Sequence, residues 1–412
     1  MLSRRTFLAG TSLLAAGLSH GAAQPAERKR LPRVAAINSI YRLRSHAYHI
    51  AGRFIYGYRR EGVQHQPPFE LVSMYNDQSP PEDLGPDVCR KHGIKLSQSV
   101  ADALGGKSLD VDAVLLIAEH GDYPVNEYGQ ILYPRFAMFE QIVDVFKSAG
   151  RSVPVFVDKH LSYDHRQAAK MVQTAREMKF GLMAGSSLPV TWRRPELDPP
   201  LQTPLREGLV CFGFDRGPAE VYFFHALEAL QCLLERRVGG ETGVKQVTGL
   251  EGDAVWKAGD AGLWSWSLLD AAVRHNPSRN YGEIREQVQR PQALLVEYSD
   301  GTRGAVLNLV EAVSELSFAG RVEGKTEPLA TSFVLPAPPG AKFFDALVEN
   351  IEKFFTTGQS PYPVERTLLT STILDLGLRS LHSQQPIADE ALDIDYTAPS
   401  DDGHMRRKFT DA

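Results

Sequence analysis

The chain has 412 residues, of which 43% are hydrophobic and 23% are charged. That composition is ordinary for a soluble globular protein, and the length suggests two domains. The 45 basic and 50 acidic residues leave a formal net charge of −5 and form no basic stripe with interleaved aromatic residues, so a nucleic-acid partner is not expected.

Residues 1–30 have the features of a twin-arginine signal peptide. Arg4 and Arg5 precede a short apolar run from Phe7 to Leu18, and Gly21-Ala22-Ala23 offers a cleavage site of small residues. The apolar run is too short to span a bilayer, and no later run reaches that length. The sequence therefore predicts export to the periplasm or the medium, with no membrane span.

The three cysteines lie far apart and show no paired spacing. In an exported protein, an odd number leaves at least one thiol free or intermolecular. We expect three buried thiols, at Cys89, Cys211 and Cys232.

Residues 31–190 alternate between short apolar runs and amphipathic segments. This alternation is typical of a Rossmann-like domain with a parallel sheet. Strands are predicted over 34–37, 69–75, 112–118, 153–157 and 181–184, and helices over 45–58, 136–148 and 163–179.

Residues 191–383 are predicted to form a second, α+β domain after a proline-rich connection. Alternating strands and the turn Ser299-Asp300-Gly301 favour a mostly antiparallel open sheet. Residues 384–412 are polar and are expected to form a loosely held tail. The predicted strands are 209–214, 244–250, 292–298, 304–309 and 314–319, and the predicted helices are 221–238, 343–356 and 363–383.

Charged and polar residues follow two neighbouring strands of the first domain. Because the carboxyl ends of parallel strands open on the ligand crevice of an α/β sheet, we expect these side chains to meet at one site. No H-x-x-x-H or C-x-x-C spacing occurs, so a metal site is not predicted. The candidates for substrate binding are Glu119, His120 and Asp122 after the first strand and His160 after the second. Glu228, in the second domain, is a further candidate for substrate binding.

Lys159, at the end of the strand over 153–157, is the first catalytic candidate. Its ammonium can hydrogen-bond a sugar hydroxyl or stabilise an alkoxide during hydride or proton transfer. The alternative is a structural ion pair with Asp158 or Glu119.

His225 is the second catalytic candidate. It lies three residues before Glu228, so both side chains share a helical face, and a neutral histidine beside a carboxylate suits a general base. A half-buried structural histidine is the alternative. Trp192 and Arg193 suit sugar stacking and hydroxyl or carboxylate binding, although a contact between domains explains them equally well.

The loop after the first strand contains no glycine where a dinucleotide-binding unit needs glycines. Side chains at Asn38, Ser39 and Arg42 occupy the volume that a pyrophosphate requires, although Arg42 can supply positive charge. Asp77 ends the second strand, where an acidic residue commonly binds an adenosine ribose, but it can also cap a turn. NAD(P) is therefore either held by these four residues in an altered way or has been lost.

One segment carries a family resemblance. Between Val153 and Ser187 the chain reads VPVFVDKHLSYDHRQAAKMVQTAREMKFGLMAGSS, which resembles the P-V-x-x-E-K-P-L-a strand and following helix of the Gfo/Idh/MocA family, founded on glucose–fructose oxidoreductase and inositol dehydrogenase. Lys159 falls on the motif's lysine, Asp158 replaces its glutamate and His160 its proline. The resemblance implies that Lys159 contacts nicotinamide and substrate.

A second match lies in the helix over 221–238. His225 matches the histidine of the family's D-x-x-x-H pattern, with Val221 at the aspartate position and Glu220 one residue earlier. The resemblance implies that His225 is the acid or base beside the reacting sugar carbon. It extends from Val34 to about Ser383 and implies a nucleotide-binding domain followed by an α/β domain, whose open sheet is a candidate surface for a homo-oligomer.

The leading hypothesis is therefore an exported oxidoreductase that acts on a sugar or sugar derivative through Lys159 and His225. One alternative is a lyase, epimerase or hydrolase that acts on sugars by acid–base chemistry without a dinucleotide, with or without a metal. The other is a non-catalytic sugar-binding relic of the fold.

Overall fold

The computed structural model describes residues 30–214, 218–336 and 340–407. The predicted twin-arginine motif and cleavage site lie outside these residues. Residues 32–412 group into one compact unit that contains two large sheets. The predicted domain boundary at residue 190 stays a prediction. No helix of the described residues has the length and apolar character needed to cross a membrane.

The first sheet has six strands, all parallel to their neighbours, in the order β5-β4-β1-β6-β7-β8. The chain moves outward from β1 in both directions, which creates a crevice at the carboxyl ends of β1 and β6. The five predicted strands are confirmed with small shifts of their ends, and β5 was not predicted. The bounds of the six strands are β1 (Arg33–Asn38), β4 (Glu70–Asn76), β5 (Lys95–Leu96), β6 (Ala113–Ile117), β7 (Val155–Asp158) and β8 (Leu182–Gly185).

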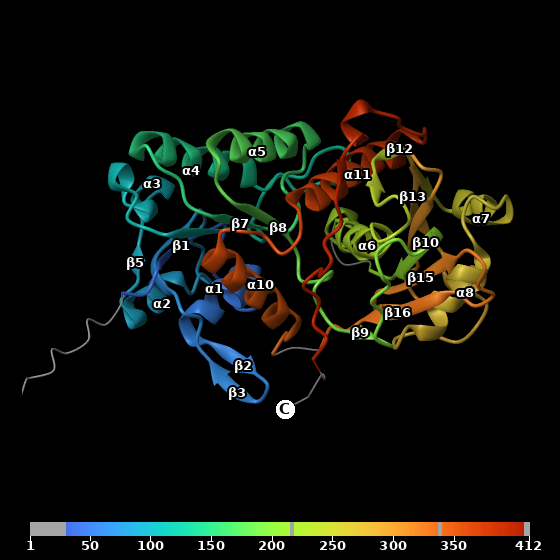
Figure 1. The fold of residues 1–412 in the computed structure, drawn as a ribbon, viewed down its shortest axis with the longest axis horizontal. Helices are drawn as coiled ribbons and strands as arrows, with labels where there is room; N and C mark the ends of the chain where they lie inside the picture. Colours follow the sequence, from blue (N-terminus) through green and yellow to red (C-terminus); the bar gives the residue numbers. More distant parts are fainter. Residues whose placement is uncertain (1–29, 215–217, 337–339, 408–412) are drawn as a thin grey trace, which may run out of the picture. The chain divides into compact units, whose positions relative to one another are not determined.

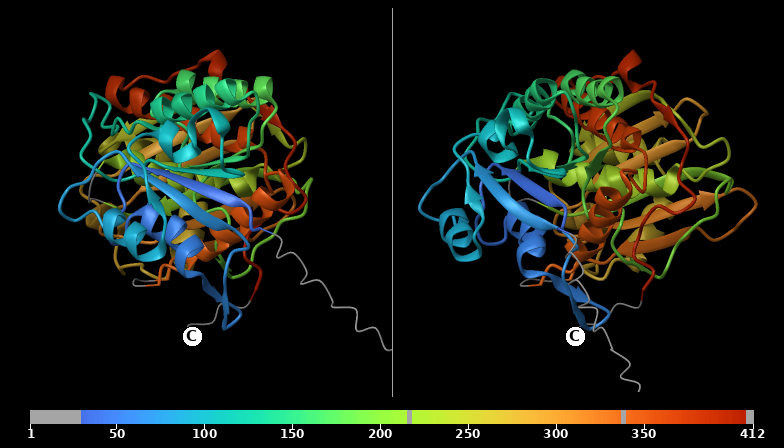
Figure 2. Two further views of the ribbon diagram at one scale, coloured as in Figure 1. Left: turned by 90° about the vertical axis from the view of Figure 1, so that its left-hand side faces the viewer. Right: turned by 60° about the vertical axis from the view of Figure 1, so that its left-hand side comes forward.

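Helices cover both faces of this sheet (Figures 1 and 2). Val34 and Ala36 of β1 point into the core beneath α1 and α10, whereas Ala35 and Ile37 point into the core beneath α3, α4 and α5. This alternation is why the strand is apolar throughout. The helices are α1 (His46–Tyr56), α2 (Gly85–His92), α3 (Val100–Leu104), α4 (Arg135–Ala149) and α5 (His165–Met178), and a hairpin of β2 (Tyr58–Arg60) and β3 (Val63–His65) follows α1.

The second sheet has seven strands in the order β12-β13-β14-β10-β15-β16-β9. β10 and β14 run parallel and the other neighbouring pairs run antiparallel, so the predicted mostly antiparallel sheet is confirmed. The bounds are β9 (Arg193–Arg194), β10 (Leu205–Phe212), β12 (Val244–Glu251), β13 (Gln292–Tyr298), β14 (Arg303–Asn308), β15 (Ser317–Val322) and β16 (Leu329–Phe333).

Both faces of the second sheet carry helices (Figure 1). Val210 and Phe212 of β10 pack beneath α6 (Ala219–Leu234) and α11 (Val364–Ser383). Leu209 and Cys211 pack beneath α7 (Asp253–Asp260) and α8 (Trp266–His275), which the sequence analysis did not predict. The face that we expected to be open to a second copy of the chain is therefore covered over β10, β14 and β15 by the chain's own helices. A short helix, α9 (Ile284–Gln287), follows α8.

The C-terminal segment packs against earlier parts of the chain. α10 (Phe343–Thr357) packs against the first sheet, and β17 (Asp395–Tyr396) pairs with β11 (Glu241–Thr242) in a separate two-stranded sheet. Leu392 and Asp402 are fully buried. The prediction of a loosely held tail is wrong for residues 384–407, because buried side chains and strand pairing hold them. Cys89, Cys211 and Cys232 are buried and unpaired, as expected.

Candidate active site

Two predicted site residues leave the first sheet through backbone turns that non-glycine residues rarely adopt. His120, after β6, and Lys159, after β7, have positive φ angles of 70° and 67°. The Lys159 amide donates to the Gly185 carbonyl at the end of β8 over 3.2 Å. Left-handed backbone at such residues costs of the order of 1–3 kcal/mol and concentrates at functional sites. The two turns direct both chain segments across the carboxyl edge of the sheet.

Lys159 forms an ion pair with Glu119, which is one of the two structural ion pairs considered for this lysine. Its Nζ is 3.3 Å from Glu119 Oε1, and Arg135, the first residue of α4, donates through Nη2 to the other carboxylate oxygen. Burial alone would raise the pKa of Glu119, but Lys159 and Arg135 outweigh it and hold that pKa far below its ordinary value. A lysine ammonium has three donors, so this pairing leaves Lys159 able to bind a second acceptor.

His160 lies in the same buried cluster, with Nε2 2.8 Å from Glu220 Oε1 of α6. Arg135 Nη1 is 3.1 Å from the same nitrogen. Burial, and then the charge of Arg135, lower the pKa of His160, so the ring is neutral near pH 7. Its Nδ1 is buried and has no partner among the described residues.

His46 and Asp158 form a second buried contact at this edge. His46 Nδ1 is 2.7 Å from Asp158 Oδ2, and the His46 and His120 rings lie 5.5 Å apart. Burial and the neighbouring His46 lower the pKa of His120 to about 4. The arrangement places the His46 and His120 rings and the fully buried Asp158 carboxylate in the neighbourhood of Lys159.

His225 and Glu228 lie together on α6, as predicted, and Ser186 joins them. Ser186 Oγ is 2.9 Å from His225 Nδ1 and donates to Glu228 Oε2, while the Ser186 amide donates to Glu228 Oε1 over 2.9 Å. A Cβ at the preceding Gly185 would lie 3.0 Å from Glu228 Oε1, so glycine allows this approach. Burial, and then the charge of Lys159, hold the pKa of His225 well below its ordinary value. The charge of Lys159 therefore lowers the pKa of His225, so the two catalytic candidates interact electrostatically.

Several buried polar atoms at this edge have no partner among the described residues. Buried polar groups are normally hydrogen-bonded, and leaving one unpaired costs about 1–3 kcal/mol. A cluster of such atoms therefore indicates a place where a polar ligand or ordered water completes the bonding. They are Asn38 Oδ1, His120 Nε2, Asp158 Oδ1, His160 Nδ1 and Tyr362 OH.

Two of the predicted cofactor-binding residues contribute to the walls of this edge. Asn38 donates through Nδ2 to Asn76 Oδ1 over 3.0 Å, and Ser39 Oγ donates to the Glu119 carbonyl over 2.8 Å. Arg42 is instead half-exposed, 3.5 Å from Glu82.

The places where a dinucleotide would put its phosphates and adenosine are occupied by the chain itself. Ser45 caps α1 and accepts from the Tyr48 amide, at the helix end that binds a pyrophosphate in dinucleotide-binding folds. Asp77 accepts hydrogen bonds from Tyr75 OH at 3.0 Å and Tyr123 OH at 2.9 Å. The residues present therefore do not fit a dinucleotide laid across β1 and β4 in the ordinary way.

Asp122 is exposed, and its backbone, rather than its carboxylate, binds Gln78. These backbone bonds fasten the loop after β6 to the loop after β4. The structure thus gives Asp122 a place in the wall between the two loops, away from the buried cluster around Lys159.

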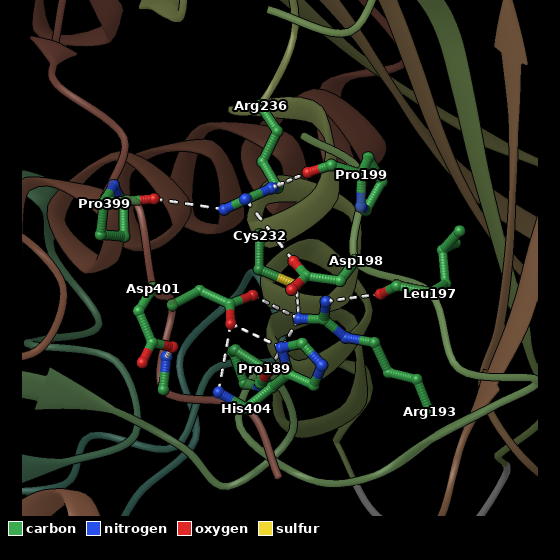
Figure 3. Close-up of polar contacts among 12 residues, drawn as sticks. Pro189, Arg193, Leu197, Asp198, Pro199, Cys232, Arg236, Pro399, Asp401 and His404 are labelled. Carbon is green, nitrogen blue, oxygen red and sulfur yellow. Dashed lines mark hydrogen bonds and ion pairs between the residues drawn. The ribbon is translucent and has the colours of Figure 1, made fainter. Parts of the chain in front are cut away.

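Trp192 and Arg193 lie elsewhere, in contacts with the C-terminal segment, and Figure 3 shows the surroundings of Arg193. Arg193 Nη2 donates to Asp402 Oδ2 over 2.6 Å, and both side chains are fully buried. Trp192 Nε1 donates to the Arg407 carbonyl over 2.7 Å. A structural contact, the alternative to substrate binding, therefore accounts for both residues. The predicted role of Arg193 in substrate binding is wrong, because its guanidinium is fully buried and bound to Asp402.

One group of three described residues has metal-ligand atoms within 4.8 Å of one another, namely Asp164, His165 and Asp375. Arg379 already donates to Asp375 Oδ1 over 2.8 Å, and Asp164 accepts two backbone amides as the cap of α5. The chain's own donors use these oxygens, so we interpret the cluster as structural.

Sequence reasoning missed five residues that line the site. Ser186, Arg135 and Glu220 lie far in the sequence from the site residues that they contact, so only spatial proximity gives them a role. His46 lies on the same helix as the buried apolar residues of α1, so its spacing did not mark it as a site residue. Tyr362 precedes α11 and was not predicted as a site residue.

The comparisons with known proteins follow the fold. No protein-family model and no curated protein matches the sequence. Among solved structures, GenD2 from gentamicin A biosynthesis, in complex with NAD, is 14% identical with a TM-score of 0.52, over 89% of this chain and 99% of that one. A probable dehydrogenase from Thermotoga maritima is 13% identical with a TM-score of 0.53, over 87% and 99%.

A myo-inositol dehydrogenase from Corynebacterium glutamicum ATCC 13032 is similar as well, at 11% identity and a TM-score of 0.51, over 87% of this chain and 99% of that one. At these identities the likeness concerns the fold. It confirms the predicted architecture, in which a Rossmann-like parallel sheet is followed by a domain with a mostly antiparallel sheet.

Proposed function

We propose that the protein is an oxidoreductase-type enzyme that acts on a sugar or sugar derivative through Lys159 and His225. The observation that carries this proposal is the cluster of buried, unpartnered polar atoms beside a lysine and a neutral histidine from the two halves of the chain. A polyol presents many hydroxyl groups, which can serve these atoms as donors and acceptors at once. The dehydrogenase fold of the similar structures supports the reaction type.

The side chains can perform the proton-transfer part of a carbinol–carbonyl interconversion. His225 is neutral, and Ser186 binds its Nδ1, so Nε2 is the ring nitrogen that can take the proton of a substrate hydroxyl. The Lys159 ammonium, held by Glu119, stabilises the oxyanion that forms. Asn38, His120 and His160 can bind the remaining hydroxyl groups.

A nicotinamide cofactor enters this proposal through the likeness to GenD2, whose structure is a complex with NAD. The Ser45 cap and the Tyr123–Asp77 hydrogen bond do not fit the ordinary mode of binding. The proton-transfer steps proposed above therefore use only the chain's own residues.

The same misfit favours a second candidate, an enzyme that moves a proton on a sugar carbon without a dinucleotide. Such a lyase or epimerase would use the same pair, His225 as base and Lys159 at the oxyanion. The two candidates differ in whether the substrate is oxidised.

One experiment separates them. Folded protein is purified and denatured, and the supernatant is examined for nicotinamide absorbance, while the folded protein is incubated with a panel of sugars and polyols and the products are analysed by mass. Nucleotide released in stoichiometric amount, together with oxidised product, supports the first candidate. Turnover to an isomer or to a dehydrated product, without nucleotide, supports the second. Binding without turnover leaves the non-catalytic alternative.

Export by the twin-arginine route belongs to the same proposal. Replacing Arg4 and Arg5 by lysine is expected to keep the protein in the cytoplasm of a host that has this pathway, whereas the unaltered chain reaches the periplasm or the medium. Fractionation followed by immunoblotting measures the difference. Equal distribution of the two forms would remove the assignment.

A further inference from the structure

Ser186 connects the base of the proposed reaction to a second, buried acid. Its hydroxyl lies between His225 Nδ1, at 2.9 Å, and Glu228 Oε2, to which it donates, while His225 Nδ1 and Glu228 Oε2 are themselves 3.6 Å apart. The Ser186 amide holds the other carboxylate oxygen at 2.9 Å and so fixes the orientation of the carboxylate. A serine hydroxyl has one proton to donate and can accept at the same time. It can therefore pass a proton from one neighbour to the other.

We propose that Ser186 and Glu228 form a proton relay behind His225, so that a proton taken from the substrate at His225 Nε2 displaces one that comes to rest on Glu228. This inference rests on the proposed function, because His225 is the base there. It gives Ser186 and Glu228 a positioning role behind His225, and Ser186 is a residue that neither the resemblance nor the sequence patterns single out.

The relay has two arrangements that differ by one proton. In the first, Glu228 is a carboxylate, Ser186 donates to it, and His225 donates from Nδ1 to Ser186, so Nε2 carries a lone pair. When Nε2 accepts the substrate proton, the Nδ1 proton moves to Ser186 and the Ser186 proton moves to Glu228. In the second arrangement, Glu228 is a carboxylic acid and His225 is again neutral, now with its proton on Nε2. No imidazolium persists.

The charges around the two residues favour this outcome. Burial raises the pKa of Glu228 to about 7, against the opposing hydrogen bonds from Ser186 and the charges of Lys159 and Arg366. Burial and Lys159 hold the pKa of His225 well below its ordinary value. A proton that enters the pair is therefore more stable on the carboxylate than on the ring.

The groups that face the relay come from each element packed against it. Lys159 follows β7, Arg366 belongs to α11, and Tyr362 precedes α11 with its hydroxyl 3.2 Å from where a Cβ on Gly185 would lie. On the His225 side the charges are those of Lys159 and Glu119 and, when protonated, the rings of His46 and His160. All of these except Glu119 disfavour a positive charge on the ring.

Nitrogen-15 NMR of the imidazoles tests the relay without requiring turnover. The full chain is labelled at its 12 histidines, and the His225 signals are assigned by their loss in His225→Gln. We expect a neutral His225 at pH 8.5 with the proton on Nδ1 and at pH 5.5 with the proton on Nε2. A ring with the same tautomer at both pH values, or an imidazolium at pH 5.5, would overturn the proposal.

Two variants provide the controls. Glu228→Gln cannot titrate, so its His225 tautomer is expected to be the same at both pH values, while Ser186→Thr keeps the hydroxyl and is expected to keep the switch. Glu228→Gln that still switches, or Ser186→Thr that does not, would count against the relay. If the His225 tautomer changes with pH but the protein turns over no substrate, the relay stands and the proposed function is wrong. If the protein is active but the tautomer does not change, the proposed function stands and the relay is wrong.

Discussion

Two buried charged clusters in this molecule look alike in composition and differ in how completely they are paired. Around Arg193, Asp402 accepts at both carboxylate oxygens, and His404 has partners at both ring nitrogens, Asp402 and Glu196, each at 2.6 Å. Of the Arg193, Asp402 and His404 side-chain atoms, Nε of Arg193 alone lacks a partner among the described residues. Figure 3 shows the Arg193 guanidinium beside the Leu197 and Pro189 carbonyls, to which it donates.

The cluster around Lys159 contains the same kinds of side chain, also buried, yet several polar atoms on neighbouring residues remain unpaired. Burial of charge therefore does not by itself distinguish a binding site from a structural contact. What distinguishes them is whether the chain satisfies its own donors and acceptors. The fold pairs nearly all the polar atoms of the Arg193 cluster, whereas it leaves polar atoms of the Lys159 cluster available to a ligand or to ordered water. The unpaired atoms of this site include Asn38 Oδ1, His120 Nε2, Asp158 Oδ1, His160 Nδ1 and Tyr362 OH.

The strongest test of this contrast replaces Lys159 by methionine. We expect turnover of an identified substrate to fall by roughly 10²–10⁴-fold, because the oxyanion loses its charged donor. The free energy of unfolding should change by no more than about 1–2 kcal/mol, since Arg135 still neutralises Glu119. Steady-state kinetics and urea denaturation measure the two effects. Lys170→Met, on the exposed side of α5, is the control, and full activity in Lys159→Met would end the assignment.

The opposite pattern is expected in the Arg193 cluster. Asp402→Ala leaves a buried guanidinium without its carboxylate and should lower the free energy of unfolding by about 3–5 kcal/mol. Asp401→Ala removes an exposed partner of Arg406 one residue away and should cost about 0–1 kcal/mol. Urea midpoints report both. If both variants lose a similar amount of unfolding free energy, the buried Arg193–Asp402 pair does not stabilise the fold as its pairing indicates.

The pH dependence of stability isolates Glu228. Because its folded pKa is raised from 4.5 to about 7, the folded protein keeps a proton that the unfolded chain loses above pH 4.5. This contribution is complete below pH 4.5 and is lost as the pH rises through 7, with a magnitude of about 3 kcal/mol. Glu228→Gln cannot lose that proton. Its stability should therefore fall less than that of the unaltered protein between pH 5 and pH 8, and parallel curves would contradict the raised pKa.

The smallest expected effect concerns the closed nucleotide crevice. Tyr123→Phe removes the hydroxyl that binds Asp77 from the loop after β6, which should strengthen NADH binding by up to about 10-fold, the value of one hydrogen bond. Tyr75→Phe removes the other hydroxyl on Asp77 without touching that loop and should leave the affinity unchanged. Fluorescence titration measures both. Tight binding of NADH by the unaltered chain would show that this hydrogen bond does not close the crevice.

Most of the fold could be predicted because its signals are local. β6 and β7 are short uninterrupted apolar runs, and α4, α5, α10 and α11 begin and end close to the predicted positions. α7 and α8 were missed because they are short, and their apolar residues, such as Leu268 and Leu269, have a role only against the sheet face that they cover. The prediction of a loosely held tail failed for the same reason, because only the fold shows that the polar residue Asp402 is buried against Arg193.

The site was predictable where topology alone brings residues together. The rule that parallel strands open on one crevice correctly brought Lys159 to Glu119, and helical spacing paired His225 with Glu228. Ser186 lies 42 residues before Glu228, and Arg193 lies 209 residues before Asp402, so neither partner could be recognised from local spacing. Long-range pairing decides whether a polar residue is available to a ligand, and that information lies in the packing.

The left-handed turns at His120 and Lys159 have a practical consequence for anyone who engineers this protein. Glycine fits that backbone conformation without strain, so glycine at His120 should relieve backbone strain and make the chain more resistant to heat. At Lys159 the same replacement would also remove a buried side chain that pairs with Glu119, and that loss opposes the gain. A mutant library selected by thermal challenge alone would accumulate the replacement at His120 and lose its imidazole. Selection for robustness and selection for catalysis would then diverge at His120 first.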